Sequence, residues 1–285
     1  TEYTDPYAFA NVTKPEDYKA FLAGEEKNAA HIFGAHERTV NGVKGVLFNV
    51  WAPKALSVSV VGEFNKYDGR VHLMERIEDT GVFELFIPGL AAGCGYMYEI
   101  KRQGKGTTRK LDPVSRQISS VPIIASVVSD ENMPDSYAWN DGLWMIKRKK
   151  EAGKKKPVTV YEVSLTDWLK EKSADELVDF VKQEGYTHVC FLPVAEYLNE
   201  EMNGYSTLGY FAVTHRIGGS DAFKKLVDDC HNAGIGVIID WNGAYFGTEA
   251  KGLYDFDGAD AYGYLKPSLE KHPEWDVVTF DYKKG

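Results

Sequence analysis

Residues 173–193 read SADELVDFVKQEGYTHVCFLP, and this stretch decides the fold of the second half of the chain. In its first part, Leu177, Phe180 and Val181 fall on one face at helical spacing, which predicts an amphipathic helix. The part that follows, THVCFLP, is a continuous apolar run, as expected of a parallel strand that is buried on both faces. The stretch therefore predicts a helix that leads directly into a buried parallel strand.

The same alternation continues in both directions. We expect strands in VTVYEVSL (158–165) and GVIIDW (236–241), and a second helix in SDAFKKLVDDCHNAG (220–234). Ser220 is the expected N-cap of this helix, and Gly234 is expected to end it. Short turns between such elements require a right-handed parallel arrangement, so the second half is expected to be an α/β domain.

The first half has a different pattern. From about Val43 to Val128, short runs rich in Val, Phe and Tyr alternate with Gly, Pro, Asp and Asn clusters, which is typical of an all-β sandwich. We expect residues 1–36 to form a helical leader, because Tyr18, Phe21 and Leu22 recur at helical spacing. The expected division is a helical leader, a sandwich, a basic linker and an α/β domain, at residues 1–36, 37–130, 131–156 and 157–285.

The basic linker contains KRKKEAGKKK (147–156). We interpret this run as a solvated connection, and an anion-binding patch is the alternative. The whole chain of 285 residues carries a net charge of −9, which disfavours general nucleic-acid binding because that requires a basic face. No apolar run approaches the roughly 20 residues of a membrane helix, so no membrane partner is expected.

Three scattered cysteines, Cys94, Cys190 and Cys230, fit neither a disulfide framework nor a metal site, which favours a cytoplasmic setting. The seven histidines show no metal-ligand spacing. The chain also has no GxGxxG after a strand and no P-loop. We therefore expect no metal and no cofactor.

Ligand-binding groups gather at the C-terminal ends of the strands in parallel α/β barrels. Asp240 lies at such an end and could be an acid, a base or a structural partner of an arginine, and the structural role is favoured. Each strand end offers polar or aromatic side chains on which a polyol could lie. The three ends read EVSL (162–165), PVAEY (193–197) and DWNGAYF (240–246).

Eleven blocks of sequence, in the correct order, resemble the bacterial 1,4-α-glucan branching enzymes of the α-amylase clan. Five resemble the family-48 carbohydrate-binding module: GAH (34–36), FNVWAP (48–53), VSVVGEFNKYDGR (58–70), GVFELFIPGL (81–90) and LDP (111–113). WM (144–145) resembles the link to the barrel. The others resemble the first part of the catalytic (β/α)8 barrel: YEVSLTDW (161–168), THVCFLPVAEY (187–197), GYSTLGYFA (204–212), GSDAFKKLVDDCHNAGIGVIIDW (219–241) and HPEW (272–275).

This resemblance implies a sandwich followed by a partial (β/α)8 barrel, with only its first three βα units in residues 157–285. Those 129 residues compare with about 250 in a complete barrel. The family transfers an α-1,4-linked glucan chain to an α-1,6 position, using a carboxylate nucleophile and a carboxylic acid/base. In the family these two residues lie on the fourth and fifth strands, so no residue of this chain is assigned a catalytic role.

The resemblance also implies sugar-facing positions. Tyr205, Tyr210 and Asp240 match the family pattern, whereas Tyr245 stands where the family has a sugar-gripping histidine. Ser164 likewise replaces a histidine. A tyrosine is not the ionisable, doubly hydrogen-bonding group that histidine provides, so the active centre is expected to be relaxed or lost.

In the sandwich, Tyr67 falls where the family places a stacking tryptophan. The expected substrate-binding residues are therefore Tyr205, Tyr210, Asp240, Tyr245 and Tyr67. We expect no second aromatic near GKGTTRK (104–110), and we expect Trp51, Trp168 and Trp241 to pack rather than bind sugar.

Two functions remain open at this point. One is the N-terminal portion of an α-glucan branching enzyme, and the other is a catalytically inactive protein that binds α-glucan or a partner. An incomplete barrel leaves apolar strand faces without partners. We therefore expect further polypeptide to cover it, or a second copy of the chain to pair with it.

Overall fold

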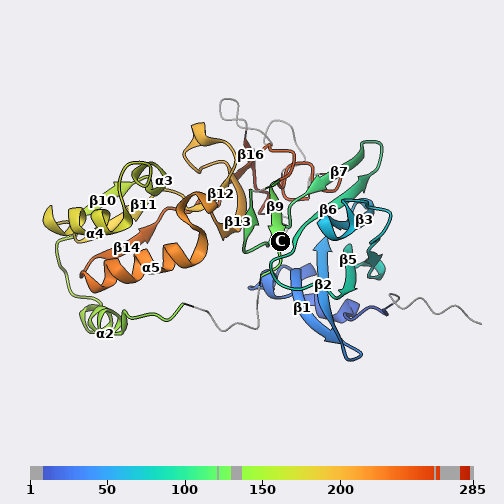
Figure 1. Cartoon of the computed structure of the whole chain (residues 1–285), viewed down its shortest axis with the longest axis horizontal. Coiled ribbons are helices and arrows are strands. Elements are labelled where there is room, and N and C mark those ends of the chain that lie inside the picture. Colours follow the sequence, from blue (N-terminus) through green and yellow to red (C-terminus); the bar gives the residue numbers. More distant parts are fainter. Residues whose placement is uncertain (1–8, 121, 130–136, 260, 264–276, 283–285) are drawn as a thin grey trace, which may run out of the picture. The chain divides into compact units, whose positions relative to one another are not determined.

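The computed structural model describes residues 9–120, 122–129, 137–259, 261–263 and 277–282 (Figure 1). The chain divides into two compact units. The sandwich unit comprises residues 1–132, 208–211 and 243–285, and the sheet unit comprises residues 133–207 and 212–242.

Two antiparallel sheets form the sandwich unit, as the sequence pattern predicts. The first has the order β1-β2-β5-β4, formed by Gly34–Val40, Val43–Trp51, Val82–Pro88 and Glu75–Arg76. The second has the order β3-β6-β9-β8, formed by Ala55–Gly62, Gly95–Arg102, Ala125–Val127 and Ile118–Ser119, with β7 (Gly106–Lys110) also paired to β6. One apolar core joins them, and the rings of Phe48 and Tyr96 meet in it edge to face at 5.0 Å.

The leader is less helical than the sequence pattern suggests. It holds three short elements: η1 (Pro15–Tyr18), α1 (Lys19–Leu22) and η2 (Ala29–His31). Tyr18 is buried and Phe21 packs with it on the sandwich, but Leu22 is 49% exposed, so the expected apolar face is wrong at this residue. Gly24 adopts a left-handed φ of 72° directly after α1, which ends the helix early.

A buried carboxylate fixes the start of the described leader. Glu84 of β5 is 1% exposed and accepts hydrogen bonds from the backbone N–H of Val12 at 2.6 Å and the Oγ1 of Thr13 at 2.5 Å. Asn49 donates to the same carboxylate at 3.2 Å. The leader is therefore held by charge-assisted hydrogen bonds as well as by ring packing.

Residues 243–259 and the short strands β15 (Tyr245–Gly247) and β16 (Val277–Thr279) belong to the sandwich unit. Arg102 pairs with Asp255 at 2.6 Å, and the ammonium of Lys110 donates to the carbonyl of Tyr254. These contacts explain why the segment groups with the sandwich rather than with the parallel strands. The division of the chain at residues 36, 130 and 156 stays a prediction. The two compact units do not have these boundaries, because residues 208–211 and 243–285 belong to the sandwich unit.

Three parallel strands form the sheet unit, in the order β10-β11-β14. They are Val160–Val163, His188–Phe191 and Gly236–Ile239. The helices that alternate with these strands are α3 (Leu165–Trp168), α4 (Ala174–Gln183) and α5 (Gly219–Asn232). Leu177 and Val181 of α4 are buried in the core of this unit and Phe180 packs on it, so the predicted strand–helix alternation is confirmed.

The helix caps follow the sequence in part. Ser173 caps α4 by accepting from the backbone N–H of Glu176, and Gly234 follows the end of α5 with a φ of 85°. The expected Ser220 N-cap is wrong, because α5 begins at Gly219 and its N-cap is Gly218. Gly218 has a φ of 88°, so the turn into the helix uses a backbone conformation that serine adopts poorly.

One face of the parallel sheet is more exposed than the other among the described residues. Glu162, Cys190 and Ile238 share a row across the three strands, on the face opposite to buried Val163 and Phe191. Ile238 is 40% exposed. This exposure agrees with a partial barrel whose interior layer is incomplete.

Part of the expected linker is helical. Helix α2 (Gly142–Glu151) lies in the sheet unit, and Asp141 before it pairs with His231 of α5 at 2.7 Å. Trp144 stacks on the same imidazole with ring centroids 5.0 Å apart. Part of the expected linker is thus a helix that Asp141 and Trp144 fix to α5, and the assignment of residues 131–156 as a linker stays a prediction. The cations of α2, from Lys147 onward, are exposed as expected.

The short strands β12 (Ala195–Tyr197) and β13 (Thr207–Val213) form a two-stranded ribbon. Single 3-10 turns accompany the longer elements, at η3 (Glu63–Asn65), η4 (Glu78–Thr80), η5 (Glu200–Met202) and η6 (His215–Ile217). Turn η5 follows β12, and turn η6 follows β13. Both turns therefore lie in the segment that connects β11 to α5.

Candidate functional site

The carboxyl ends of the parallel strands bring together two of the sequence-predicted residues. The hydroxyl of Tyr205 donates a hydrogen bond to the Asp240 carboxylate, which directly follows β14. The Asn242 amide donates to the carbonyl of Tyr205 at 3.0 Å. Asp240 is thus held by a phenol in this structure, and no ion pair with an arginine is recorded for it among the described residues.

Tyr210 and Tyr245 form a second pair, in the sandwich unit. The Tyr210 hydroxyl donates to the backbone carbonyl of Tyr245 at 2.6 Å, and its ring meets Phe280 edge to face at 5.4 Å. The contact at Tyr245 is made by its backbone at the start of β15, so it does not depend on the tyrosine side chain. The structure therefore groups the four barrel-side residues as two pairs, each in its own unit.

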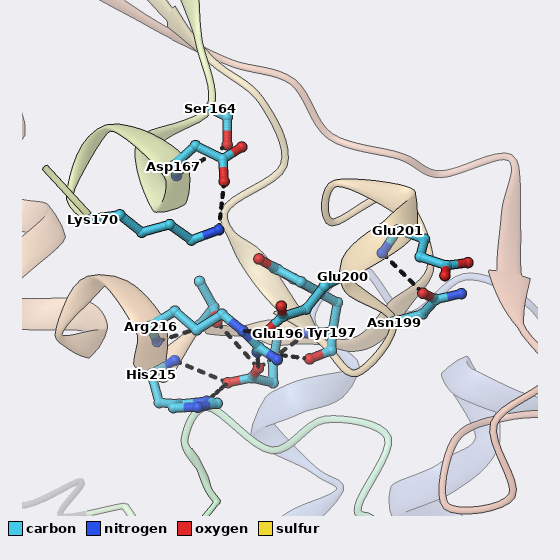
Figure 2. Close-up of polar contacts among 11 residues, drawn as sticks. Ser164, Asp167, Lys170, Glu196, Tyr197, Asn199, Glu200, Glu201, His215 and Arg216 are labelled. Carbon is cyan, nitrogen blue, oxygen red and sulfur yellow. Dashed lines mark hydrogen bonds and ion pairs between the residues drawn. The ribbon is translucent and has the colours of Figure 1, made fainter.

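A buried charge network follows the second strand end, and the sequence reasoning missed it. Glu196 of β12 has no exposed side-chain surface, and it accepts from Nη1 of Arg216 at 3.0 Å (Figure 2). It also accepts from the hydroxyl of Thr214 at 3.1 Å and from the backbone N–H of His215 at 2.9 Å. The His215 ring approaches the same carboxylate at 2.9 Å. The signal was available in the polar run THR (214–216), which directly follows an apolar strand.

Arg216 also fixes the chain beyond Glu196. Its guanidinium lies 4.3 Å from the ring centroid of Tyr197 and donates to the Tyr197 carbonyl at 2.9 Å. Because Tyr197 is only 4% exposed, its ring serves packing and offers no surface to a sugar.

A shallow depression lies above this network, where β10 and β11 end. Its polar lining includes Ser164, Asp167, Lys170 and Glu200. Asp167 and Lys170 form an exposed ion pair at 2.8 Å, which lowers the pKa of the carboxyl and raises the pKa of the ammonium (Figure 2). Ser164 caps α3 by accepting from the backbone N–H of Asp167. Its hydroxyl therefore has a structural role, at the position where the sequence resemblance implies a histidine.

The fifth predicted residue, Tyr67, lies in the loop between η3 and β4 of the sandwich unit. Its ring is partly exposed, and the Arg109 guanidinium lies 5.7 Å from the ring centroid. Partial burial raises the pKa of the Tyr67 phenol, Glu63 adds to this effect and Arg109 opposes it. Tyr67 therefore keeps an aromatic surface at the sandwich position expected to contact sugar. Sequence reasoning missed Arg109 because an aromatic was sought in that segment.

The three tryptophans behave differently. Trp51 packs against Phe21 at 5.5 Å, and Trp168 packs on the core of the sheet unit, as expected. Trp241 is 61% exposed, so unlike Trp168 it does not lie in or against the core of the sheet unit. It follows the edge strand β14, and an edge strand has a neighbour on one side only.

No cluster of three or more His, Cys, Asp or Glu side chains suited to a metal occurs among the described residues. Within the same residues, no helix combines the length and the apolar character needed to cross a bilayer.

Comparison with known proteins first identifies a domain within the sandwich unit. Residues 32–115 match the family model of carbohydrate-binding module 48, the isoamylase N-terminal domain. Two solved structures share the fold of this chain. A Salmonella typhimurium protein described as an alpha amylase superposes with a TM-score of 0.62 at 24% identity, covering 87% of this chain and 38% of that protein. The catalytic module of the pneumococcal glycogen-degrading protein SpuA superposes with a TM-score of 0.61 at 19% identity, covering 88% of this chain and 42% of that one.

Proteins of similar sequence then point to a more specific group of relatives. The chain is 40% identical over 293 aligned residues to the 1,4-alpha-glucan branching enzyme GlgB of Methylococcus capsulatus, and 40% identical over 288 to that of Nitrosococcus oceani. These matches cover 99% and 98% of this chain but only 39% and 38% of the relatives. The chain is thus a homologue of bacterial branching enzymes GlgB and spans about two fifths of their length.

Proposed function

We propose that this chain is the N-terminal, α-glucan-binding portion of a glycogen branching enzyme. The observation that carries the proposal is the continuous similarity to GlgB proteins across both units, including the module-48 segment that bears Tyr67. The substrate would be an α-1,4-glucan such as glycogen, amylose or a maltooligosaccharide. Tyr67 would stack on a sugar ring, because an aromatic face suits the apolar face of a sugar.

At the barrel mouth, Tyr205 and Asp240 would contact the glucan as a pair, since the phenol and the carboxylate already share a hydrogen bond. In the sandwich unit, Tyr210 and Tyr245 would be further, separate contacts of the glucan. In a retaining mechanism a second carboxyl group must face the nucleophile across the scissile bond. No such pair is assigned to residues 1–285, so the chain by itself is expected to bind glucan without transferring it. The chemistry would come from further barrel strands.

A second candidate is a catalytically inactive protein that binds α-glucan or a partner. It is favoured by the substitutions at the mouth, where Tyr245 and Ser164 replace histidines of the family pattern. The two proposals share glucan binding and differ in whether further polypeptide restores catalysis. For both we propose a cytoplasmic location, in keeping with the free Cys94, Cys190 and Cys230.

The proposal is tested with the purified chain on amylose. We expect retardation in a gel containing amylopectin, and no shift in the colour of the iodine–amylose complex after incubation. Tyr67→Ala is expected to lose most of the retardation, because it removes the aromatic surface. Migration that is independent of amylopectin would contradict glucan binding. A shift in iodine colour would show that the chain itself forms α-1,6 branches.

A further inference from the structure

The loop that carries Tyr67 has an unusual backbone. Lys66 and Tyr67 adopt φ values of 55° and 57°, in the left-handed region that residues with a Cβ seldom occupy. Hydrogen bonds hold them there: the Tyr67 N–H donates to the Gly62 carbonyl at 2.8 Å, and buried Asn65 accepts from the Gly62 N–H at 3.0 Å. Two consecutive strained residues persist only where their surroundings fix them, and such positions are concentrated at functional sites.

A contact from strand β7 fixes the ring of Tyr67. Arg109 of β7 lies over one face of Tyr67, and its Nη2 donates to the Tyr67 carbonyl at 2.9 Å. Its Nε donates to the Glu99 carboxylate of β6 at 3.0 Å. The loop also lies directly on Glu99, since a Cβ at Gly69 would fall 2.1 Å from Oε1 of that carboxylate. Arg109 is therefore anchored on the sheet at one end and on the loop at the other.

We propose that Arg109 is a positioning residue for an α-glucan platform, clamping one face of Tyr67 so that the opposite face receives a sugar ring. This inference rests on the proposed function and names the residue that organises its sandwich site. A ring that is already held in place loses little rotational freedom when the ligand binds, so more of the contact energy appears as affinity.

The surroundings of the ring suit a neutral polyol. The Arg109 side chain is 44% exposed, so the clamp and the Tyr67 ring lie at the surface, where a polyol can reach them. The Glu99 and Glu63 carboxylates near the ring can accept from hydroxyls. An anionic ligand would be repelled by these carboxylates.

The first measurement is the affinity for maltoheptaose, by calorimetry on the full chain. Arg109→Ala is expected to weaken binding about threefold to tenfold, because it removes the cation–π contact and a hydrogen bond. Arg109→Lys keeps the positive charge but lacks the planar guanidinium, so its affinity should lie between those of Arg109→Ala and the wild type. Lys101→Ala, an exposed cation on the neighbouring strand β6, is the matched control and should bind like the wild type.

The second measurement reports on the ring itself. Because the Arg109 guanidinium lies over the Tyr67 ring, Arg109→Ala should shift the ring resonance of Tyr67 in 13C-tyrosine NMR, with the resonance assigned by Tyr67→Phe. Lys101→Ala should leave this resonance unchanged. A general loss of structure would not select this one tyrosine.

The outcomes separate the two claims. If the wild type binds maltoheptaose, Tyr67→Ala weakens it and Arg109→Ala does not, the positioning role is wrong and glucan binding stands. A weakened Arg109→Ala with an unmoved Tyr67 resonance also overturns the positioning role. If the wild type does not bind, the proposed function fails together with the inference.

Discussion

Replacing Glu196 by alanine tests the buried network at the second strand end. The Glu196 side chain has no exposed surface, and its carboxylate accepts from Thr214, His215 and Arg216. Removing it leaves the Arg216 guanidinium, itself only 18% exposed, without its main counter-charge. Breaking a buried pair in this way costs about 3–5 kcal/mol. Because the side chain of His215 is 37% exposed and can be hydrated, we expect the lower end of that range, about 3 kcal/mol.

Glu200→Ala is the matched control. Glu200 also approaches Arg216, at 3.4 Å, but its side chain is 71% exposed, so its loss should cost less than about 1 kcal/mol. Urea unfolding followed by circular dichroism and by tryptophan fluorescence measures both variants. Equal urea midpoints for Glu196→Ala and Glu200→Ala would refute the argument. Burial would then make no difference to the free energy that the contact with Arg216 contributes to folding.

Three further predictions follow. Burial lowers the pKa of Lys110 from 10.5 to about 8, so the folded state binds the proton less tightly than the unfolded state. The free energy of unfolding of the wild type, relative to that of Lys110→Met, should therefore rise between pH 8 and 10.5. The pKa difference corresponds to a rise of about 3 kcal/mol. Urea titrations across this pH range that show no change, or a fall, would contradict the prediction. Glu84→Ala should release the leader and cost about 2–3 kcal/mol, seen as faster proteolysis near Val12, and an unchanged cleavage rate would contradict the anchoring role. We also propose that a second copy of the chain covers the sheet face of Ile238, so Ile238→Lys should reduce self-association in light scattering. Leu56→Lys, on a more exposed leucine of β3, should not; a monomeric wild type at micromolar concentration would count against this proposal.

The regular elements could be predicted from the sequence because local patterns determine them. The apolar stripe of α4 has the period of a helix. The apolar run that contains His188–Phe191 has no period, but it is too short for a helix and a proline follows it; its residues are only partly buried on one face. The leader was harder to predict, because Tyr18 and Phe21 satisfy a helical spacing over a single turn while Gly24 ends the helix. The start of α5 was misplaced because Gly218 and Gly219 give the chain a turn that needs no side-chain cap.

The site could be predicted less completely, because its contacts join residues that are distant in sequence. The match of Tyr205 and Asp240 to a family pattern brought out both residues, but their mutual hydrogen bond depends on the packing of two strand ends. The Glu196–Arg216 pair spans 20 residues and carries no local period. Arg109 reaches Tyr67 across 42 residues, and only the pairing of β6 with β7 places it there.

The most direct test of glucan binding at Tyr67 is hydrogen–deuterium exchange of the full chain with and without maltoheptaose. We predict slower exchange at residues 62–70 and 106–110, the two segments that hold Tyr67 and Arg109, and loss of this protection in Tyr67→Ala. Unchanged exchange in both segments at saturating maltoheptaose would contradict the assignment of the sandwich as an α-glucan-binding unit.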